Sequence, residues 1–436
     1  MPNGSDSLRV SVRIFLVSRA WVFVVAAGAF AVFGVDHDNA QRFGNSPFAD
    51  PFGGTGEAVL SVWSRWDSLW YLGIANEGYG FSQDSSAFFP LFPLVSLALG
   101  GYLAWPLGRE EGIFLGAVIA SLASFAGALY VLHRLVALER DPPTATVAVA
   151  LLAFFPMAVF FSTIYSESLF LLCSVAAVWF ARTDRWALAG LAGAASAATR
   201  SLGILVLVPL VLLYLLGPRG TGTSAKSYLG VAWRKRDGRR RTYPLRRDVL
   251  WLMLVPAGML VYLGYLWIET GDPFRFEQAQ EVWGRESVHL GSIPVGPFGG
   301  IVPGVQKAVE GIAELFAEGG WTVWTPDGGH SLRAAGMNVE AFLFFVFAVV
   351  ATIGVFRRLP IAYGAYAVAL LVFPLSMPTE SVPLISLPRY VAVVFPFFMW
   401  LAIWTRERHW ERPAVAVSAV GLGLYTAQWA TWQWVA

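Results

Sequence analysis

The chain has 436 residues, of which 56% are hydrophobic and only 14% are charged. Soluble domains carry about 25% charged residues, so this composition excludes a soluble globular protein and indicates an all-α, polytopic membrane protein. The net charge of +2 points to no particular partner, and the single cysteine, Cys173, excludes an internal disulfide. Cys173 lies in an apolar run, where we expect a buried, unreactive thiol.

Apolar runs of span length recur along the whole sequence. The first is long and lacks a small-residue cleavage site, so we interpret it as a retained anchor and not as a cleaved signal. We expect about eleven crossings of the membrane. The predicted spans cover about residues 11–34, 112–138, 144–163, 167–181, 186–199, 201–217, 249–268, 339–356, 360–377, 390–404 and 413–432.

The basic residues predict the orientation of these spans, because Lys and Arg are enriched in cytoplasmic loops. The strongest cluster, residues 219–247, holds ten Lys or Arg and one acid, Asp237. All basic clusters can face the cytoplasm only if residues 88–107 do not cross but re-enter or lie along the outer leaflet. The N-terminus is then cytoplasmic and the C-terminus outside. The clusters are residues 133–140, 182–185, 219–247, 357–358 and 406–412.

This orientation gathers the polar groups of the spans on the extracytoplasmic side. Two long loops belong there, residues 35–111 and 270–338, and the whole chain forms one multi-pass domain. Asp67, Glu167, Arg200 and Arg389 all fall on that side as well. None of these four residues belongs to a basic cluster, so the orientation was inferred without them. Because all four still fall on one side, we predict a polar site at the outer face.

The first loop contains an aromatic stretch around Asp67. Read as a helix, it places Trp63, Trp66, Trp70 and Ile74 on one stripe, with Asp67 beside it and Gly78 at the end. This pattern is typical of an amphipathic helix in the membrane interface. Two interpretations are open, an aromatic belt with a solvated aspartate and a site built on Asp67. Nearby, Asp84 and Glu77 are expected to be solvated, with Glu77 as the reserve acid.

Three further positions place polar residues at the ends of apolar runs. Ionisable groups inside a membrane usually face a cavity or a partner, which favours a function for Tyr165-Ser166-Glu167 and for Arg200. Arg389 and Tyr390 start a late span and suit a phosphate or a sugar hydroxyl. The alternatives are a helix-end acid capped by Ser166, a snorkelling Arg200 and an interface anchor at Arg389.

The second loop offers weaker candidates for a sugar site. Amides and aromatic faces contact sugars, which makes Gln278, Gln280 and Trp283 candidates, although a loop of this composition would contain such residues in any case. His330 is expected to be an ordinary loop histidine, because no second His or acid stands at metal-ligand spacing. We therefore expect no metal and no other cofactor.

Several of these strings resemble the PIG-V family, the second mannosyltransferase of GPI-anchor assembly, and its bacterial relatives. The similarity is carried in order by Trp66-Asp67, Tyr71 to Tyr79, Phe88 to Leu94, Pro156 to Phe170 and Arg200-Ser201-Leu202-Gly203. Beyond residue 250 only Gly271-Asp272-Pro273 and Pro388-Arg389-Tyr390 match. The resemblance implies glycosyltransferase family 76, a GT-C fold, a catalytic acid in the first loop and a polyprenyl- or dolichyl-phosphate mannose donor.

The candidate residues allow a mechanism of this kind. Arg200, together with Arg389, would neutralise the departing phosphate, and Asp67 would act as general base on the attacking hydroxyl. Displacement from the opposite face inverts the sugar's anomeric centre. Glu167 would orient sugar or acceptor. The expected substrate-binding residues are Arg65, Trp66, Tyr71, Tyr165, Arg200, Gln278, Arg389 and Tyr390.

Other functions are compatible with the same sequence. One is a transporter or flippase of lipid-linked sugars, although the two related halves typical of many transporters are not evident. Another is a GT-C enzyme that acts on a protein or polysaccharide. The expected partners are the lipid-phosphate sugar, a lipid or glycolipid acceptor and membrane lipids, with no nucleic acid. The Ala, Gly and Arg content favours a bacterial plasma membrane.

Overall fold

The computed structural model describes residues 4–36, 39, 48, 51–52, 60–220, 243–280, 289–290, 293–294, 298–317 and 330–435. These residues are almost entirely helical, which confirms the predicted all-α fold class. The α-helices are α1 (Gly4–Phe33), α4 (Ser68–Glu77), α5 (Leu91–Leu107), α6 (Arg109–Glu139), α7 (Pro142–Ala153), α8 (Glu167–Arg182), α9 (Trp186–Thr199), α10 (Leu207–Leu216), α11 (Leu254–Thr270), α12 (Arg275–Gln278), α13 (Ile301–Ala317), α14 (His330–Arg358), α15 (Ile361–Ser376), α16 (Leu387–Val393), α17 (Phe395–Glu407) and α18 (Glu411–Ala430).

Short 3-10 helices and a small hairpin complete the described structure. The hairpin pairs β1 (His289–Leu290) with β2 (Ile293–Pro294) in antiparallel register, with His289 opposite Pro294. The 3-10 helices are η1 (Ser61–Trp63), η2 (Tyr79–Phe81), η3 (Gln83–Ala87), η4 (Pro156–Phe161), η5 (Ser201–Val206) and η7 (Arg247–Met253).

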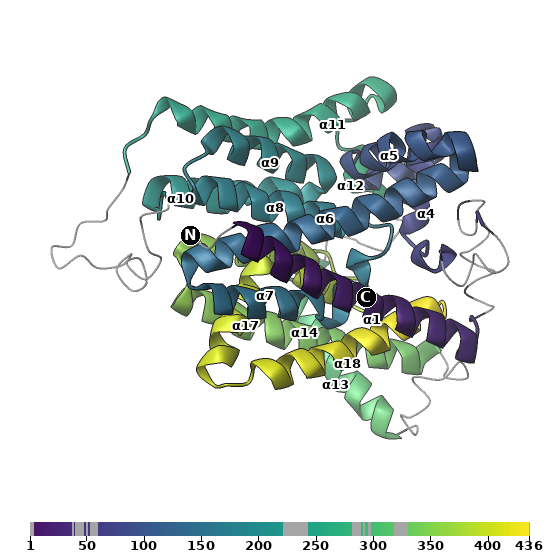
Figure 1. The fold of residues 1–436 in the computed structure, drawn as a ribbon. Coiled ribbons are helices and arrows are strands. Elements are labelled where there is room, and N and C mark those ends of the chain that lie inside the picture. Colours follow the sequence, from purple (N-terminus) through teal and green to yellow (C-terminus); the bar gives the residue numbers. More distant parts are fainter. Residues whose placement is uncertain are drawn as a thin grey trace.

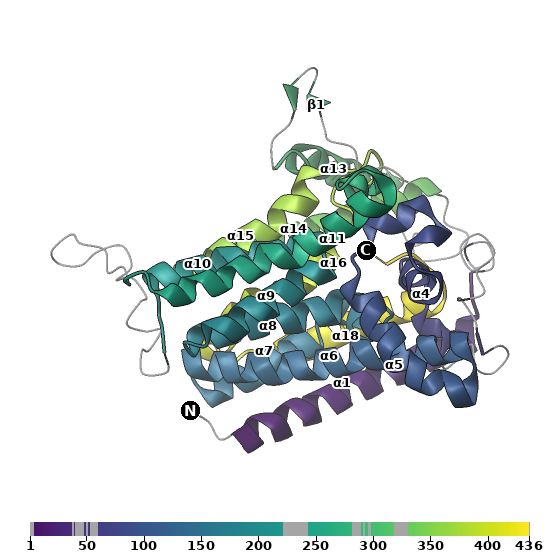
Figure 2. The ribbon, with the colours of Figure 1, turned by 90° about the horizontal axis from the view of Figure 1, so that it is seen from above.

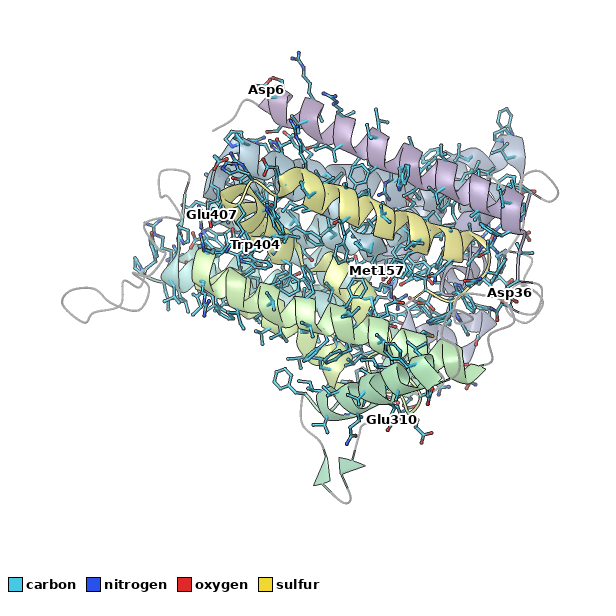
Figure 3. The ribbon with its side chains drawn as sticks, turned by 90° about the horizontal axis from the view of Figure 1, so that it is seen from below. Asp6, Asp36, Met157, Glu310, Trp404 and Glu407 are labelled. Atoms are coloured by element: carbon cyan, nitrogen blue, oxygen red, sulfur yellow. The ribbon has the colours of Figure 1, made fainter. Side chains whose placement is uncertain are left out.

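The long helices run side by side and give the molecule two distinct ends (Figure 1). The N-terminus lies at one end, and α4 and α5 lie at the other, in both views (Figures 1 and 2). Asp6 and Glu407 lie at the first end and Asp36 at the second (Figure 3). The basic cluster of residues 406–412 and the N-terminus therefore share one end, as the charge pattern predicts.

The number of membrane crossings remains a prediction. In the described part of the chain, four helices are long and apolar enough to cross a membrane, or up to five if the bent pair of α16 and α17 forms one span. Shorter apolar helices cover residues 91–107, 142–153, 186–199, 201–216 and 361–376. Most boundaries agree with the predicted spans, and α9 starts and ends at the predicted residues.

The helix α5 packs against α6 at backbone contact distance. A Cβ added to Gly100 would lie 2.5 Å from the Cα of Ile113, and one added to Gly116 would lie 2.4 Å from the backbone nitrogen of Gly100. Small residues allow this close approach in membrane helices. Because Gly100 faces Gly116 and Ala104 faces Gly112, α5 runs antiparallel to the first half of α6. That residues 88–107 do not cross the membrane stays a prediction.

The predicted continuous helix through Trp63, Trp66, Trp70 and Ile74 is wrong in its first half. The helix α4 begins only at Ser68, and Trp66 adopts a left-handed backbone with φ of 54°. Trp63 belongs to η1, where its ring packs 4.6 Å from that of Phe23 in α1. Tertiary contacts of the two tryptophans thus replace the periodic stripe. The predicted end at Gly78 is confirmed, since its backbone donates to Ile74.

Two of the predicted elements are also interrupted. The span predicted over residues 144–163 is helical only to Ala153 and continues as η4, which starts at Pro156. The second long loop contains α13 and the first residues of α14, so it is partly helical. Most of the basic loop 219–247 and the candidate Trp283 lie outside the described residues, as does the side chain of His330.

Candidate active site

Four charged side chains from distant parts of the chain meet at the ends of helices. Asp67 immediately precedes α4, Glu167 is the first residue of α8, Arg200 follows α9, and Arg389 lies in α16. Arg389 Nη1 donates to Asp67 Oδ2 at 2.7 Å, and Arg200 Nη1 donates to Glu167 Oε1 at 2.6 Å. Arg389 Nε lies 3.4 Å from the same Glu167 oxygen. The structure thus joins the residues that the charge pattern predicts on one side.

The cluster is buried and balanced in charge. The side chain of Glu167 is 1% exposed, whereas Arg389, Arg200 and Asp67 expose 10%, 13% and 19%. Two acids face two arginines, which offsets the cost of taking four charges out of water. An added anion would have to compete with the carboxylates for the guanidinium groups, and it would find two cations already oriented toward one cavity.

Irregular backbone at helix junctions positions these side chains. The chain between α7 and α8 passes through η4, α9 ends at Arg200 before η5, and α16 bends by 74° into α17. Non-helical backbone at membrane depth is tolerated where it is buried in protein or lines a cavity. Each break directs a polar side chain that a continuous helix would have aimed elsewhere.

Two buried tyrosines hold the acidic segments. The backbone nitrogen of Asp67 donates to the Tyr165 hydroxyl at 3.1 Å, and the Tyr71 hydroxyl lies 2.8 Å from Ser166 Oγ. The Ser166 hydroxyl therefore contacts Tyr71, and it makes no side-chain cap on α8. Burial raises the pKa of Tyr71 and of Tyr165 well above the usual tyrosine range. Both phenols stay neutral at physiological pH, which excludes them as bases.

Arg200 is held as a cation. Burial by itself would lower the pKa of its guanidinium, but the charge of Glu167, together with Tyr390 and Tyr71, outweighs burial and raises the pKa above the ordinary value. The guanidinium also lies 5.2 Å from the ring centroid of Tyr390, a cation–π contact. Arg200 is therefore a permanent positive charge in the wall of the site.

The four charged groups line one cavity with several residues that the sequence did not single out. Tyr71, Tyr390 and Gln280 were candidates, and Phe88, Phe89, Ser201 and Leu202 belong to strings that resemble the PIG-V family. The remaining lining residues are Ala87, Thr199, Phe373, Ile385, Ser386 and Trp434. Most of these are apolar residues without a polar motif, so only their place in the fold reveals them.

Some predicted residues support the cavity without lining it. The Arg65 guanidinium is buried, lies 4.3 Å from the ring centroid of Trp432 and donates to the Ala430 carbonyl at 3.1 Å. Trp66 packs edge-on against Trp432 and Trp434, at 5.6 and 4.7 Å between ring centroids. Both residues connect the start of α4 to the segment after α18.

Other predicted residues do not line the cavity. The Gln278 amide donates to Asp272 Oδ2 at 2.7 Å in an exposed position, so Gln280, and not Gln278, lines the cavity. Glu77 is exposed at the end of α4. Asp84 lies in η3 outside the cavity lining. Within the described ranges, His, Cys, Asp and Glu form no group of three or more that could hold a metal ion.

Sequence comparison relates the chain to known mannosyltransferases. The sequence profile of the family "Mannosyltransferase (PIG-V)" matches residues 12–215. The rat GPI alpha-1,6-mannosyltransferase 2 is 34% identical over 182 residues, covering 40% of this chain and 36% of the rat protein. The GPI mannosyltransferase pigv-1 of Caenorhabditis elegans is 31% identical over 175 residues, covering 36% of this chain and 25% of that protein.

A third relative and a solved structure complete the comparison. The GPI mannosyltransferase 2 of Drosophila pseudoobscura pseudoobscura is 32% identical over 131 residues, covering 28% of this chain and 29% of that protein. The matches thus span about a quarter to a third of the relatives' lengths. The apo oligosaccharyltransferase of Archaeoglobus fulgidus is similar with a TM-score of 0.46 and 13% identity, covering 94% of this chain and 56% of that chain.

The family match includes three of the four charged residues of the cavity. Asp67, Glu167 and Arg200 fall within residues 12–215, whereas Arg389 lies outside that range. The three relatives align over 131–182 residues at 31–34% identity. Residues 12–215 of this chain therefore match the PIG-V mannosyltransferase family.

Proposed function

We propose that this protein is an inverting mannosyltransferase that moves mannose from a polyprenyl-phosphate donor to a lipid or glycolipid acceptor at the extracytoplasmic face. Asp67 is the general base, Arg200 and Arg389 bind the donor phosphate, and Glu167 orients the sugar. The observation that carries the proposal is the pair of arginines held by two carboxylates in one cavity. The match to the PIG-V mannosyltransferase family supports mannose as the transferred sugar.

The charge arrangement supports a phosphate-bearing donor. A sugar bound to a lipid phosphate already has a good leaving group, so catalysis needs charge stabilisation on the departing phosphate. Arg200 and Arg389 are cations that line the cavity, and guanidinium groups recognise phosphate oxygens.

The ion pair between Arg389 and Asp67 suggests that donor binding precedes proton transfer. Arg389 Nη1 donates to Asp67 Oδ2 at 2.7 Å. The donor phosphate competes for Arg389 and weakens this contact, which frees the carboxylate to accept the proton of the acceptor hydroxyl. The hydroxyl oxygen then bonds to the anomeric carbon as the bond from that carbon to the phosphate oxygen breaks. Asp67 holds the proton, and the phosphate leaves with the electron pair.

The first test is transfer of label from radiolabelled polyprenyl-phosphate-mannose into a lipid extract by purified protein in vesicles. We expect the wild type to label a lipid and Asp67→Asn to lose at least about a hundredfold in rate, as typical for a lost general base. Both proteins should bind the donor. Glu77→Gln, on the exposed end of α4, is the matched control and should keep the wild-type rate.

The same assay separates the alternatives. Retained turnover in Asp67→Asn would falsify the base assignment. Loss of turnover in Glu77→Gln would transfer that role to the reserve acid. If no lipid is labelled while lipid-linked mannose crosses the vesicle membrane, the transporter interpretation replaces the enzyme.

A further inference from the structure

The segment after α18 folds back onto the start of α4. The backbone reverses at Trp432, which has a left-handed φ of 61°, and the Gln433 nitrogen donates to the Gln428 carbonyl at 2.9 Å. The Asp36 nitrogen, after α1, donates to the Thr431 carbonyl at 2.9 Å. These bonds hold the segment against the bundle and bring Trp434 into the lining of the cavity, beside Asp67 and Arg389.

The indole of Trp434 contacts the residue that presents the proposed base. Its ring lies 4.7 Å from that of Trp66 at an interplanar angle of 76°, an edge-to-face contact. Trp66 is the left-handed residue directly before Asp67. Trp434 thus has two structural relations to the site, because it supports Trp66 and because it forms part of the cavity wall.

Three buried polar atoms in the cavity residues lack a hydrogen-bond partner within the described part of the chain. One is Arg389 Nε, which lies 3.4 Å from Glu167 Oε1 as part of an ion pair. The other two are the indole nitrogen of Trp434, a donor, and Oε2 of Glu167, an acceptor. Buried polar groups are nearly always paired, and a buried Trp N–H usually finds an acceptor. A ligand that satisfies both atoms has to accept one hydrogen bond and donate another.

This requirement identifies the chemistry of the ligand portion at this end. The oxygens of a phosphodiester accept hydrogen bonds but cannot donate to Glu167. A hydroxyl group does both. The guanidinium groups of Arg200 and Arg389 already provide donors for the phosphate. The two unpartnered atoms therefore fit a ring that carries several hydroxyl groups, next to the phosphate position and not at it.

We propose that Trp434 is a specificity-determining residue of a sugar subsite, where its indole N–H donates to a hydroxyl of the transferred sugar and Glu167 Oε2 accepts from another. This inference rests on the proposed function for the identity of the sugar. The expected preference is for a sugar-bearing lipid over the bare lipid phosphate. The inference assigns this preference to Trp434, which lies more than two hundred positions beyond the end of the family match.

The test compares binding of two radiolabelled probes, polyprenyl-phosphate-mannose and polyprenyl phosphate, to purified protein in vesicles. We expect Trp434→Phe to weaken binding of the mannose-bearing lipid by about tenfold, typical of one lost hydrogen bond, and to leave binding of the bare lipid unchanged. Phenylalanine keeps an aromatic ring against Trp66. Trp404→Phe, at the opposite end of the bundle (Figure 3), is the matched control and should bind both probes normally.

Each result tests the inference through lipid binding alone, so no sugar transfer is required. Equal binding of the mannose-bearing lipid by wild type and Trp434→Phe would overturn it. A parallel loss for both probes would also overturn it, because that pattern belongs to a residue that only supports Trp66. A wild type that shows the expected selective binding but no transfer would refute the proposed reaction and leave the sugar subsite in place.

Discussion

Arg389 connects the two acids of the candidate site. Its guanidinium contacts Asp67 through Nη1 and approaches Glu167 through Nε, while Arg200 forms its ion pair with Glu167. The two arginines would therefore have different effects on binding of the proposed donor phosphate. Movement of Arg389 toward the phosphate would free the proposed base, whereas movement of Arg200 would change the environment of Glu167.

At the residue scale, we predict that Arg200→Ala weakens binding of polyprenyl phosphate most among the site variants, by about tenfold to a hundredfold. The reason is that a hydrogen bond to a charged group contributes about 1.5–3 kcal/mol. Equilibrium binding of the radiolabelled lipid measures this. Arg358→Ala is the control, since Arg358 pairs with Glu407 at an exposed position, with exposures of 41% and 43%. Unchanged binding by Arg200→Ala would refute the phosphate role.

The charged residues of the candidate site can be predicted from the sequence more readily than the other residues that line the cavity. Asp67, Glu167, Arg200 and Arg389 could be predicted because a charge at the end of an apolar run is costly and needs a partner. Trp434 and Ser386 could not, because a tryptophan or serine beside a membrane span carries no such cost. Gln278 and Gln280 differ by two positions on one short segment, and only packing decides that Gln280 faces the cavity.

The breaks between helices determine where the charged residues lie. The junction of α7, η4 and α8 is secured from α1, where the buried Arg19 donates to the carbonyls of Ala153 and Ala158 at 2.9 Å each and to Ser162 Oγ at 2.7 Å. Its guanidinium also lies 4.8 Å from the ring centroid of Phe125. Arg19 thereby satisfies carbonyls that the interrupted helix leaves without donors.

At the element scale, we predict that Arg19→Met lowers the stability of the folded protein. The variant leaves buried carbonyls without donors, and each unsatisfied buried group costs about 1–3 kcal/mol. Thermal unfolding in detergent measures the change. Arg13→Met, on the exposed face of the same helix, should change stability by no more than about 0.5 kcal/mol. Equal unfolding temperatures for the two variants would contradict this role of Arg19.

The helix breaks also mark the limit of prediction from periodicity. The spans over residues 167–181 and 186–199 agree closely with α8 and α9, because an uninterrupted apolar run has no competing structure. The stretch from Trp63 to Trp70 has helical spacing, yet Trp66 is left-handed there. Edge-to-face contacts with Trp432 and Trp434, which are distant in sequence, override the local preference.

At the scale of the whole molecule, the Lys- and Arg-rich clusters and the candidate site lie at opposite ends. Asp6 and Glu407 lie at one end and Asp36 at the other (Figure 3). The Lys- and Arg-rich clusters favour the cytoplasm for the first end. The cavity would then open toward the extracytoplasmic side, where the proposed acceptor lipid is located.

We predict that single cysteines at the two ends react differently with a membrane-impermeant maleimide. In intact cells Glu77→Cys should be labelled and Asp6→Cys should react only after permeabilisation, because α4 and the N-terminus lie at opposite ends. The native Cys173 is buried and is expected to stay unlabelled. Treatment of the wild-type protein with the same maleimide is the control. Labelling of Asp6→Cys from outside would reverse the orientation.

The sequence by itself determined the membrane class, most helix boundaries, the similarity to the PIG-V family and the charged residues of the candidate site. Each of these follows from local composition or from the cost of a charge in an apolar run. Only the tertiary structure decided which groups pair with one another, that Trp66 is left-handed, and that Trp434 reaches the cavity. These features depend on contacts between segments such as residues 63–67 and 431–435, which lie next to each other only after the helices have packed.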